Sequence, residues 1–319
     1  MTTQRILVIG TGSIGTRHAN NIEALGGRAE RLSLRELGLD GVLARIAKDD
    51  AQGAVIATAT QLRQPLIEAC AERGLPVYVE KPVAYTRQGL ADFYAAALPI
   101  AERSIAGFMM RYHPLLRPLQ DIVAEDDIFR FDFEIGHDVT QWRANWSFAG
   151  SYAALPEGGG VLLDLCHELD LAHTLFPETE LKTVESLGHK DFPGVDMATQ
   201  IALAGPAQSG SVAMDYLAPV FSRMIRLRGQ GAITECDLLT GTTTRRRPEN
   251  DPQVTQVEFE RNAMFLGAMG DFMSLIDGRE PPSGNPNIPR LDLARPSCDL
   301  IASAWASRNF CGTIEKDMT

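Results

Sequence analysis

Short apolar runs alternate with amphipathic stretches through residues 5–109 of this chain. The runs have the length of buried strands, and the apolar positions between them recur at helical spacing. The predicted strands are 5–9, 28–34, 53–58, 76–79 and 104–109. Strands that alternate with helices predict a parallel, doubly wound sheet with helices on both faces. Ligands of such sheets bind at the carboxyl ends of the strands, where the strand order reverses.

The pattern changes after Pro114, where strands follow one another with few helices between them. A first strand is predicted at 128–135, and others near 181–187, 197–203, 209–217, 224–227 and 232–238. Helices are predicted at 161–176, 262–276 and 294–310. Closely spaced strands predict a mainly antiparallel, open sheet. We therefore expect an α/β domain at residues 1–115 and an α+β domain at residues 116–319.

The composition limits the class of protein but does not identify a function. The chain has 319 residues, 45% of them hydrophobic, which is enough for one large or two medium domains. Its net charge of −11 opposes binding to nucleic acid or to an anionic membrane. Because no apolar stretch approaches the roughly 18 residues of a membrane span and the first strand begins by residue 5, we expect a cytoplasmic protein without a secretory signal.

The five cysteines are scattered, odd in number and absent from any Cys-x-x-Cys pair. This pattern predicts reduced thiols, with neither a disulfide framework nor a zinc site. We expect no bound metal.

The sequence Gly10-Thr-Gly12-Ser-Ile-Gly15 lies between the first apolar run and an amphipathic stretch. A strand, a Gly-x-Gly-x-x-Gly turn and a helix together form the dinucleotide-binding fingerprint of the Rossmann fold. Gly10 permits the tight turn, Gly12 lets a pyrophosphate approach the backbone, and Gly15 lets the helix pack on the strand. Ser13 and Ile14 begin the helix whose unpaired N–H groups attract phosphates. The alternative is an ordinary glycine turn.

Two further clusters carry chemical groups. Glu80-Lys81-Pro82 follows the fourth predicted strand, which puts a lysine at the ligand-binding edge of the sheet. Asp164, His167 and Asp170 stand three residues apart on the predicted helix 161–176, so that neighbours share a face. A histidine beside a carboxylate is suited to carry a proton. A solvated lysine and a surface Asp-x-x-His pair are the alternatives.

These residues together resemble the glucose–fructose oxidoreductase / inositol dehydrogenase (Gfo/Idh/MocA) family of two-domain NAD(P)-dependent sugar oxidoreductases. The resemblance extends over nearly the whole chain. It rests on the glycine turn, Ala57-Thr58, Glu80-Lys81-Pro82, Gly107-Phe108 through Pro114, and the glycine-led helix with Asp164 and His167. A subgroup associated with surface-polysaccharide and sialic-acid synthesis is also similar, through Ser151–Ala154, His167–Asp170 and Arg261–Phe265.

The resemblance implies hydride transfer between a nicotinamide and a secondary alcohol of a sugar or sugar derivative. It implies that Lys81 donates to the reacting oxygen, that His167 moves the hydroxyl proton, and that Asp164 orients one of them. Asp170 is then a surface or outer residue, and the peptide bond before Pro82 is often cis. Cofactor contacts are implied for Gly10, Gly12, Ser13, Ile14, Gly15, Thr58, Glu80 and Lys81.

Three positions depart from the family pattern. The histidine follows Asp164 by three residues rather than four, Arg63 stands where histidine is common, and Met109 stands where asparagine is common. Two other functions remain open on the same fold. One is a non-catalytic dinucleotide-binding sensor, which would not need both Lys81 and His167. The other is an NAD-dependent glycosidase, which would release a sugar without net formation of NADH.

Aromatic and basic residues before the helix suggest a substrate wall. Trp142, Arg143 and Tyr152 form a candidate sugar-stacking surface with Trp146, and packing of the tryptophans is the alternative. Arg111 and Arg143 would suit an anionic group, which favours an acidic or nucleotide-linked sugar.

The residue at the end of the second strand, about 20 positions after the glycine turn, selects between NAD and NADP. An acid there binds the ribose 2′-OH of NAD, whereas an arginine accommodates the 2′-phosphate of NADP. Ser33 and Arg35 flank the predicted strand end, so we favour NADP over NAD. A strand one residue longer would bring Glu36 to the ribose instead and favour NAD.

The open antiparallel sheet also predicts a homo-oligomer, a dimer or tetramer.

Overall fold

The computed structural model describes residues 3–142 and 147–318. The chain forms two compact units, and each contains two separate segments. The first unit consists of Met1–Tyr112 and Glu260–Asp299, and the second of His113–Phe259 and Leu300–Thr319. The predicted boundary at 115/116 lies close to the first passage between the units. The predicted domain 116–319 differs from the second unit, because Glu260–Asp299 returns to the first.

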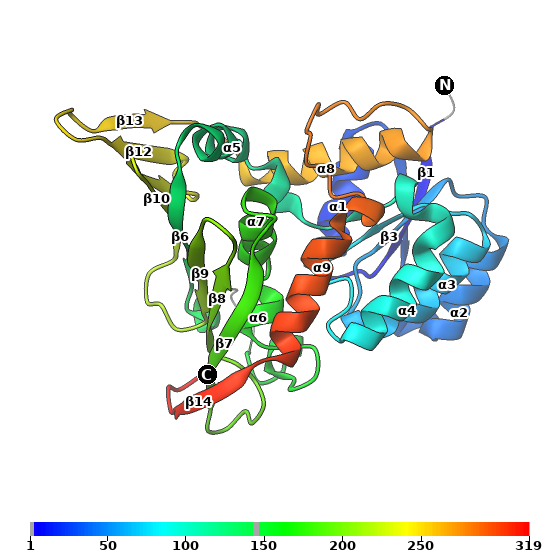
Figure 1. Ribbon diagram of the computed structural model, residues 1–319. Helices are drawn as coiled ribbons and strands as arrows, with labels where there is room; N and C mark the ends of the chain where they lie inside the picture. Colours follow the sequence, from blue (N-terminus) through cyan, green and yellow to red (C-terminus); the bar gives the residue numbers. More distant parts are fainter. Residues whose placement is uncertain (1–2, 143–146, 319) are drawn as a thin grey trace. The chain divides into compact units, whose positions relative to one another are not determined.

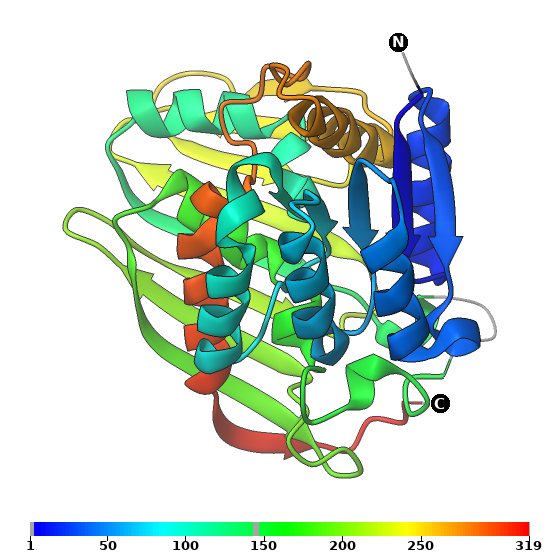
Figure 2. The ribbon, with the colours of Figure 1, turned by 90° about the vertical axis from the view of Figure 1, so that its right-hand side faces the viewer.

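The sheet of the first unit is parallel, with strand order β2-β1-β3-β4-β5. Its strands are β1 (Arg5–Ile9), β2 (Arg28–Leu32), β3 (Gly53–Ile56), β4 (Val77–Val79) and β5 (Ile105–Ala106). Its helices are α1 (Ser13–Ala24), α2 (Leu34–Lys48), α3 (Arg63–Glu72), α4 (Arg87–Ala97) and α8 (Arg261–Ile276). This arrangement confirms the doubly wound α/β sheet (Figures 1 and 2).

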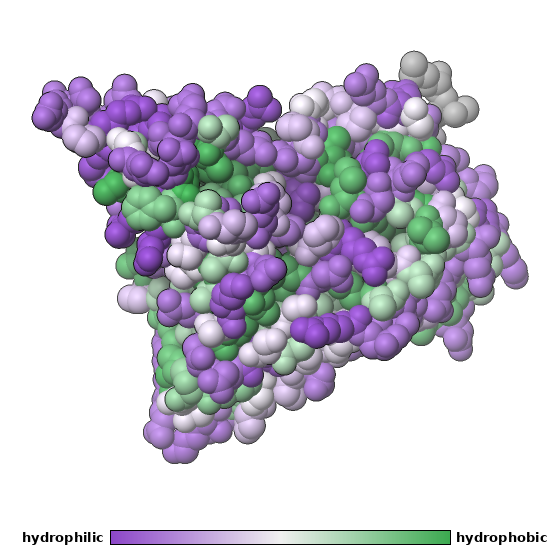
Figure 3. Space-filling model, in the orientation of Figure 1, coloured by the Kyte–Doolittle hydropathy of each residue, from purple (hydrophilic) through white to green (hydrophobic). Residues whose placement is uncertain are grey.

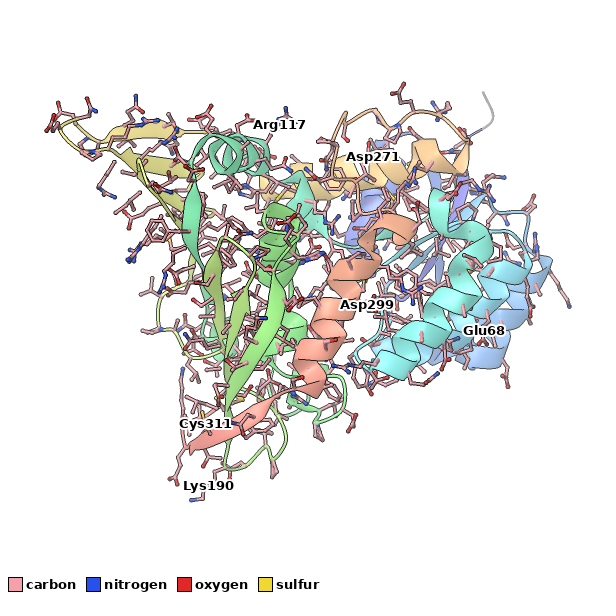
Figure 4. The ribbon with its side chains drawn as sticks, viewed as in Figure 1. Glu68, Arg117, Lys190, Asp271, Asp299 and Cys311 are labelled. Carbon is pink, nitrogen blue, oxygen red and sulfur yellow. The ribbon has the colours of Figure 1, made fainter. Side chains whose placement is uncertain are left out.

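Helix α8 completes the core of the first unit. Its Met269 and Phe272 are fully buried in one cluster with Val8, Val55 and Tyr78 of the sheet. A parallel sheet needs both faces covered, and α8 supplies part of that cover from a segment about 150 residues after β5. On the same helix, Asp271 accepts hydrogen bonds from the Tyr112 hydroxyl and the Ser283 amide, at 2.9 and 3.0 Å (Figure 4).

The second strand is shorter than predicted. It ends at Leu32, and Ser33 caps α2 by accepting a hydrogen bond from the amide of Glu36 at 3.3 Å. The apolar Leu34 is therefore the first residue of a helix rather than the last of a strand. A serine three residues before a glutamate is the sequence pattern of a helix start, and here it prevails over the apolar run. The predicted fifth strand is also shorter, because 3₁₀ turn η3 (Met109–Tyr112) follows it closely.

The second unit contains a nine-stranded sheet with order β13-β12-β11-β10-β6-β9-β8-β7-β14. Its strands are β6 (Ile128–Gly136), β7 (Glu180–His189), β8 (Ala198–Ala204), β9 (Ser209–Asp215), β10 (Ser222–Gly229), β11 (Ile233–Asp237), β12 (Thr242–Arg246), β13 (Gln253–Gln256) and β14 (Asn309–Ile314). Two described pairings, β6 with β9 and β7 with β14, are parallel and the others are antiparallel. The predicted mainly antiparallel sheet is confirmed.

Strands β12, β13 and β14 were not predicted, and the first two lack an apolar pattern. Strand β12 is Thr-Thr-Thr-Arg-Arg, and every residue of β13 is exposed. This end of the sheet is hydrophilic in the space-filling view (Figure 3). Strand β14 begins inside the predicted helix 294–310, since α9 (Leu291–Ala306) ends four residues earlier than expected.

Helices α5 (Leu116–Glu125), α6 (Val161–Asp164) and α7 (His167–Leu175) belong to the second unit. The single helix predicted at 161–176 is wrong, because the chain leaves helical geometry at Leu165 and resumes at His167. The 3₁₀ turns η1, η2, η4 and η5 span Thr60–Leu62, Leu98–Arg103, Val139–Gln141 and Tyr152–Ala154. In the described ranges, no helix has both the length and the apolar character needed to cross a membrane.

Candidate functional site

The glycine turn that joins β1 to α1 packs closely against neighbouring main-chain atoms. Gly10 has φ +111°, and a Cβ there would lie 2.4 Å from the carbonyl oxygen of Ala57. A Cβ on Gly15 would lie 1.9 Å from the carbonyl oxygen of Gly10. Gly12 differs, since within the described chain no atom lies within 4 Å of a Cβ built there. The turn is therefore tightly packed on the protein side and open on the other, as close approach of a ligand to the backbone requires.

The N-terminus of α1 faces the same open side. Gly12 is its N-cap residue, and among the residues that the structure describes no side chain caps it. Gly12 and Ser13 are exposed, and Ile14 is half-buried. The first amides of α1 and the positive end of its dipole can thus meet an anion. Since β1 lies between β2 and β3, the strand order reverses here, where a dinucleotide's pyrophosphate would fit.

Strand β4 delivers Glu80 and Lys81 to the same edge of this sheet. Lys81 is half-buried, and the peptide bond between Lys81 and Pro82 is cis, as the family resemblance implies. The Glu80 carboxylate hydrogen-bonds to Nε2 of His18 at 2.7 Å and accepts a bond from the Lys81 amide at 3.3 Å. Burial alone would raise the pKa of Glu80, but the His18 bond and the nearby charges of His18, Lys81 and Arg63 lower it.

The Glu80 carboxylate therefore has partners within the protein. His18 is fully buried, and its ring lies 4.7 Å from the ring of Tyr78 at an interplanar angle of 55°. This inward contact fixes the main chain at Lys81, whereas the predicted contact between Glu80 and the cofactor stays a prediction. Thr58 follows β3 at this edge and is half-buried, with its hydroxyl 3.2 Å from the carbonyl oxygen of Ala59.

The second cluster lies in the second unit, where Asp164 ends α6 and His167 begins α7. The predicted single helix is interrupted between them by two residues of non-helical or capping geometry, and the predicted shared face of Asp164 and His167 stays a prediction. The Asp164 carboxylate accepts hydrogen bonds from the hydroxyls of Tyr152 and Tyr216, at 2.7 and 2.9 Å. Asp170 is fully buried on α7, which excludes the surface alternative and leaves that of an outer residue as a prediction.

Tyr216 is a site residue that the sequence did not reveal. It is fully buried after β9, and its ring meets that of Trp142 edge-on at 5.4 Å. Burial raises the pKa of Tyr216 well above its ordinary value, and the neighbouring Asp164 carboxylate raises it further. Tyr216 therefore stays protonated and donates to Asp164. No local motif marks it, since it lies 52 residues from its partner.

Asp196 holds α6 in place below this cluster. Its carboxylate accepts from the Leu162 amide at 2.8 Å and from the Thr199 hydroxyl at 3.2 Å, and it pairs with Arg308. Gly160 has φ +89°, and a Cβ there would lie 2.2 Å from Asp196. The glycine before α6 thus permits the close approach of a buried carboxylate that fixes the position of Asp164.

Comparisons with known proteins find a local sequence match to inositol 2-dehydrogenases. No family model matches the chain. Inositol 2-dehydrogenase 4 of Saccharopolyspora erythraea is 30% identical over 34% of this chain, and the match spans 38% of that relative's length. Inositol 2-dehydrogenase of Agrobacterium fabrum is 29% identical over the same shares. The chain thus matches well under half the length of these curated relatives.

Solved structures extend the similarity of fold to nearly the whole chain. An inositol dehydrogenase homologue complexed with NAD+ from Azotobacter vinelandii has a TM-score of 0.78 at 16% identity, covering 95% of each chain. A 3-ketoreductase from Actinomadura kijaniata in complex with NADP and TDP-benzene has a TM-score of 0.76 at 15% identity, covering 99% of this chain and 100% of that one. These matches show that the chain has the fold of this dehydrogenase homologue and this ketoreductase.

The substrate-binding residues predicted from the resemblance to the glucose–fructose oxidoreductase / inositol dehydrogenase family have different environments. Arg111 is 8% exposed and donates to the Ser297 hydroxyl at 3.1 Å, which favours a structural role in the first unit. Trp142 and Tyr152 lie with Asp164 and Tyr216 in the second unit, and Tyr152 is 52% exposed. Arg143 and Trp146 lie outside the described residues.

The residues predicted to select the family's cofactor follow β2. Ser33 occupies the first position after the strand and is 8% exposed, while Arg35 and Glu36 are exposed in the first turn of α2. Arg35 is therefore a helix residue, and the predicted strand end between Ser33 and Arg35 is wrong. The observation that no acid directly follows the strand still holds.

Proposed function

We propose that this protein catalyses reversible hydride transfer between a nicotinamide dinucleotide and a secondary alcohol of a sugar or sugar derivative. The observation that carries the proposal is the combined geometry of the first unit. An open helix N-terminus, uncapped by any described side chain, follows the close-packed glycine turn, and Lys81 comes two residues after the end of β4 at the same sheet edge. The local similarity to inositol 2-dehydrogenases supports the same chemistry.

Gly10, Gly12, Ser13, Ile14 and Gly15 would hold the pyrophosphate, with Thr58 and the main chain at Glu80 and Lys81 nearer the nicotinamide. When bound, the nicotinamide supplies the hydride acceptor for oxidation and the donor for reduction. The Lys81 ammonium donates a hydrogen bond to the reacting oxygen, whose developing negative charge it stabilises. His167 accepts the hydroxyl proton during oxidation and returns it during reduction.

Asp164 keeps a positioning role in this scheme. Its two tyrosine donors fix the direction of the carboxylate beside His167 in the chain. We propose that Asp164 orients His167 or Lys81 and that Tyr152, which bonds to Asp164 and is half exposed, contacts the substrate. Trp142 and Arg143 complete the proposed sugar-binding wall.

The proposed substrate class and the proposed cofactor both follow from the charges of arginine side chains. We propose an acidic or nucleotide-linked sugar, because an arginine at position 143 suits a carboxylate or phosphate. The fold neighbour solved with TDP-benzene supports a nucleotide-linked substrate. We propose NADP rather than NAD, because a serine follows β2 and an exposed arginine lies two residues on. We also propose a homo-oligomer, with the open face of the nine-stranded sheet covered by a second copy.

Absorbance of the reduced nicotinamide tests the reaction directly. Purified protein is mixed with NADP or NAD and a panel of free, acidic and nucleotide-linked sugars, with glycosides as controls. Turnover of at least one sugar with matching formation of reduced cofactor is expected. Tight cofactor binding without turnover on the whole panel would favour a sensor, and release of a sugar from a glycoside without net reduction would favour a glycosidase.

A further inference from the structure

The side chain of Arg63 is buried at the carboxyl edge of the first unit's sheet. It is the first residue of α3 and is 4% exposed. Its guanidinium donates to three main-chain carbonyl groups. Nε and Nη2 bond to the carbonyl oxygen of Thr58 at 3.2 and 2.8 Å, and Nη1 bonds to the carbonyl oxygens of Glu80 and Pro82.

These carbonyl groups belong to the segments that follow two adjacent strands. Thr58 follows β3, and Glu80 and Pro82 lie immediately before and after Lys81. The Lys81 amide itself donates to the Glu80 carboxylate at 3.3 Å. The main chain around Lys81 is thus held at the carbonyl groups of both neighbouring residues and through the N–H group of Lys81 itself.

A guanidinium is suited to this task in a way that an ammonium is not. Its donors point outward in one rigid plane, so that one buried group can bind several carbonyls at fixed directions. It also stays charged at every accessible pH, so the link does not open by deprotonation. A lysine at the same position would present one compact charge and could not reproduce the three directions.

We propose that Arg63 is a positioning residue that fixes Lys81 for hydride transfer by tying its flanking carbonyls to the end of β3. The inference rests on the proposed function, because Lys81 is the group whose position matters. Arg63 acts through the main chain and need not touch the substrate. It sets the direction in which the Lys81 side chain leaves the sheet edge.

The test compares Arg63→Lys with a matched control on the same helix. Arg73 follows α3 at its other end and likewise donates to main-chain carbonyls, those of Ile46 at 2.7 Å and Asp49 at 2.6 Å. Arg63→Lys is expected to lower kcat roughly 10- to 100-fold, since small misplacement of a reacting group costs rates of this order. Its cofactor Kd should change much less. Arg73→Lys is expected to leave kcat unchanged, although it too removes a link between carbonyls.

Amide hydrogen exchange of the segment that contains Lys81 gives a readout independent of turnover. Exchange in residues 77–86 is expected to be about tenfold faster in Arg63→Lys than in wild type or Arg73→Lys, because the flanking peptides lose their common donor. Arg63→Gln, which keeps two amide donors without the charge, provides a second variant if Arg63→Lys does not fold.

The outcomes separate the two proposals. Wild-type kcat in Arg63→Lys, or equal losses of kcat in Arg63→Lys and Arg73→Lys, would overturn the positioning role. If the wild type oxidises or reduces no sugar, the proposed function fails. Amide hydrogen exchange then tests Arg63 on its own, and unchanged exchange around Lys81 in Arg63→Lys would overturn its positioning role.

Discussion

The hydroxyl of the buried Tyr216 donates to the Asp164 carboxylate at 2.9 Å, across 52 residues of sequence. Tyr152 donates to the same carboxylate from the exposed side at 2.7 Å. The two bonds differ in what can replace them. Water can take over the role of the exposed Tyr152 hydroxyl, whereas the buried Tyr216 hydroxyl has no such substitute.

Tyr216→Phe should therefore destabilise the protein more than Tyr152→Phe does. Loss of a hydrogen bond to a charged group is expected to lower the free energy of unfolding by about 1.5–3 kcal/mol in Tyr216→Phe. In Tyr152→Phe the loss should stay below about 1 kcal/mol, because water hydrates the carboxylate. Urea unfolding of both variants measures the difference. Equal losses would show that Asp164 does not depend on its buried partner.

Lys81→Ala tests the proposed electrostatic and proton-donating group. We expect kcat to fall by roughly 10²–10⁴-fold, as for a lost acid–base group, while cofactor affinity is largely retained. His167→Ala should give a loss of the same order. Steady-state kinetics on the best sugar of the panel provide the measurement. If both variants turn over normally, the assignment of Lys81 and His167 is wrong.

Arg35→Ala tests the choice of cofactor. If the exposed guanidinium binds the 2′-phosphate, kcat/KM for NADP should fall about 10- to 100-fold, the range of a lost charged hydrogen bond, and kcat/KM for NAD should hardly change. Glu36→Gln is the matched variant for the opposite hypothesis. A wild-type preference for NAD that weakens in Glu36→Gln and survives Arg35→Ala would assign the ribose to Glu36.

His113 makes stability depend on pH. Its ring accepts from the Leu115 amide at Nδ1 and hydrogen-bonds at Nε2 to the Leu238 carbonyl, at 3.1 and 3.0 Å, an arrangement that suits the neutral form. Burial lowers the pKa of His113 from 6.5 to about 4, although the bond to Leu238 opposes the shift. As pH falls below 6.5, the unfolded chain therefore binds the proton first, and stability is lost until the pH reaches about 4.

The contribution of the neutral His113 ring is fully present above pH 6.5. As the pH falls from 6.5 to about 4, the free energy of unfolding of the wild type should drop by roughly 3 kcal/mol relative to that of His113→Gln, whose side chain cannot titrate. Urea unfolding of both proteins across this pH range measures the difference. Parallel stability curves would show that the ring is protonated in the folded state as readily as in the unfolded chain.

Light scattering tests the proposed self-association. A homodimer or homotetramer at micromolar concentration should give two or four times the chain mass of 34.8 kDa. On this sheet an ion pair at 2.6 Å joins Arg226 of β10 to Glu235 of β11. A mass close to that of one chain would contradict the prediction.

Local patterns predicted the first sheet and its glycine turn well. The strand, turn and helix around Gly10 and Gly15 are encoded within about twenty consecutive residues, and their steric requirements are strict. The position of Lys81 near a strand end follows in the same way, because a buried apolar run ends at Val79, two residues before it.

Features that depend on contacts between residues far apart in sequence could not be predicted. The break between Asp164 and His167 contains no glycine or proline, so the sequence pattern there continues as a helix. Asp164 has its donors on Tyr152 and Tyr216, and neither spacing forms a motif. The buried links of Arg63 are also invisible in sequence, since their acceptors are main-chain groups that every residue possesses.

The late position of α8 in the chain has a consequence for biosynthesis. The strands of the first sheet are complete at Ala106, but Met269 and Phe272, which bury Tyr78 and Val55, emerge from the ribosome much later. At ordinary elongation rates of 5–20 residues per second, the gap of about 170 residues lasts roughly ten to thirty seconds. Throughout that interval, the nascent chain carries part of an apolar sheet face without its native cover.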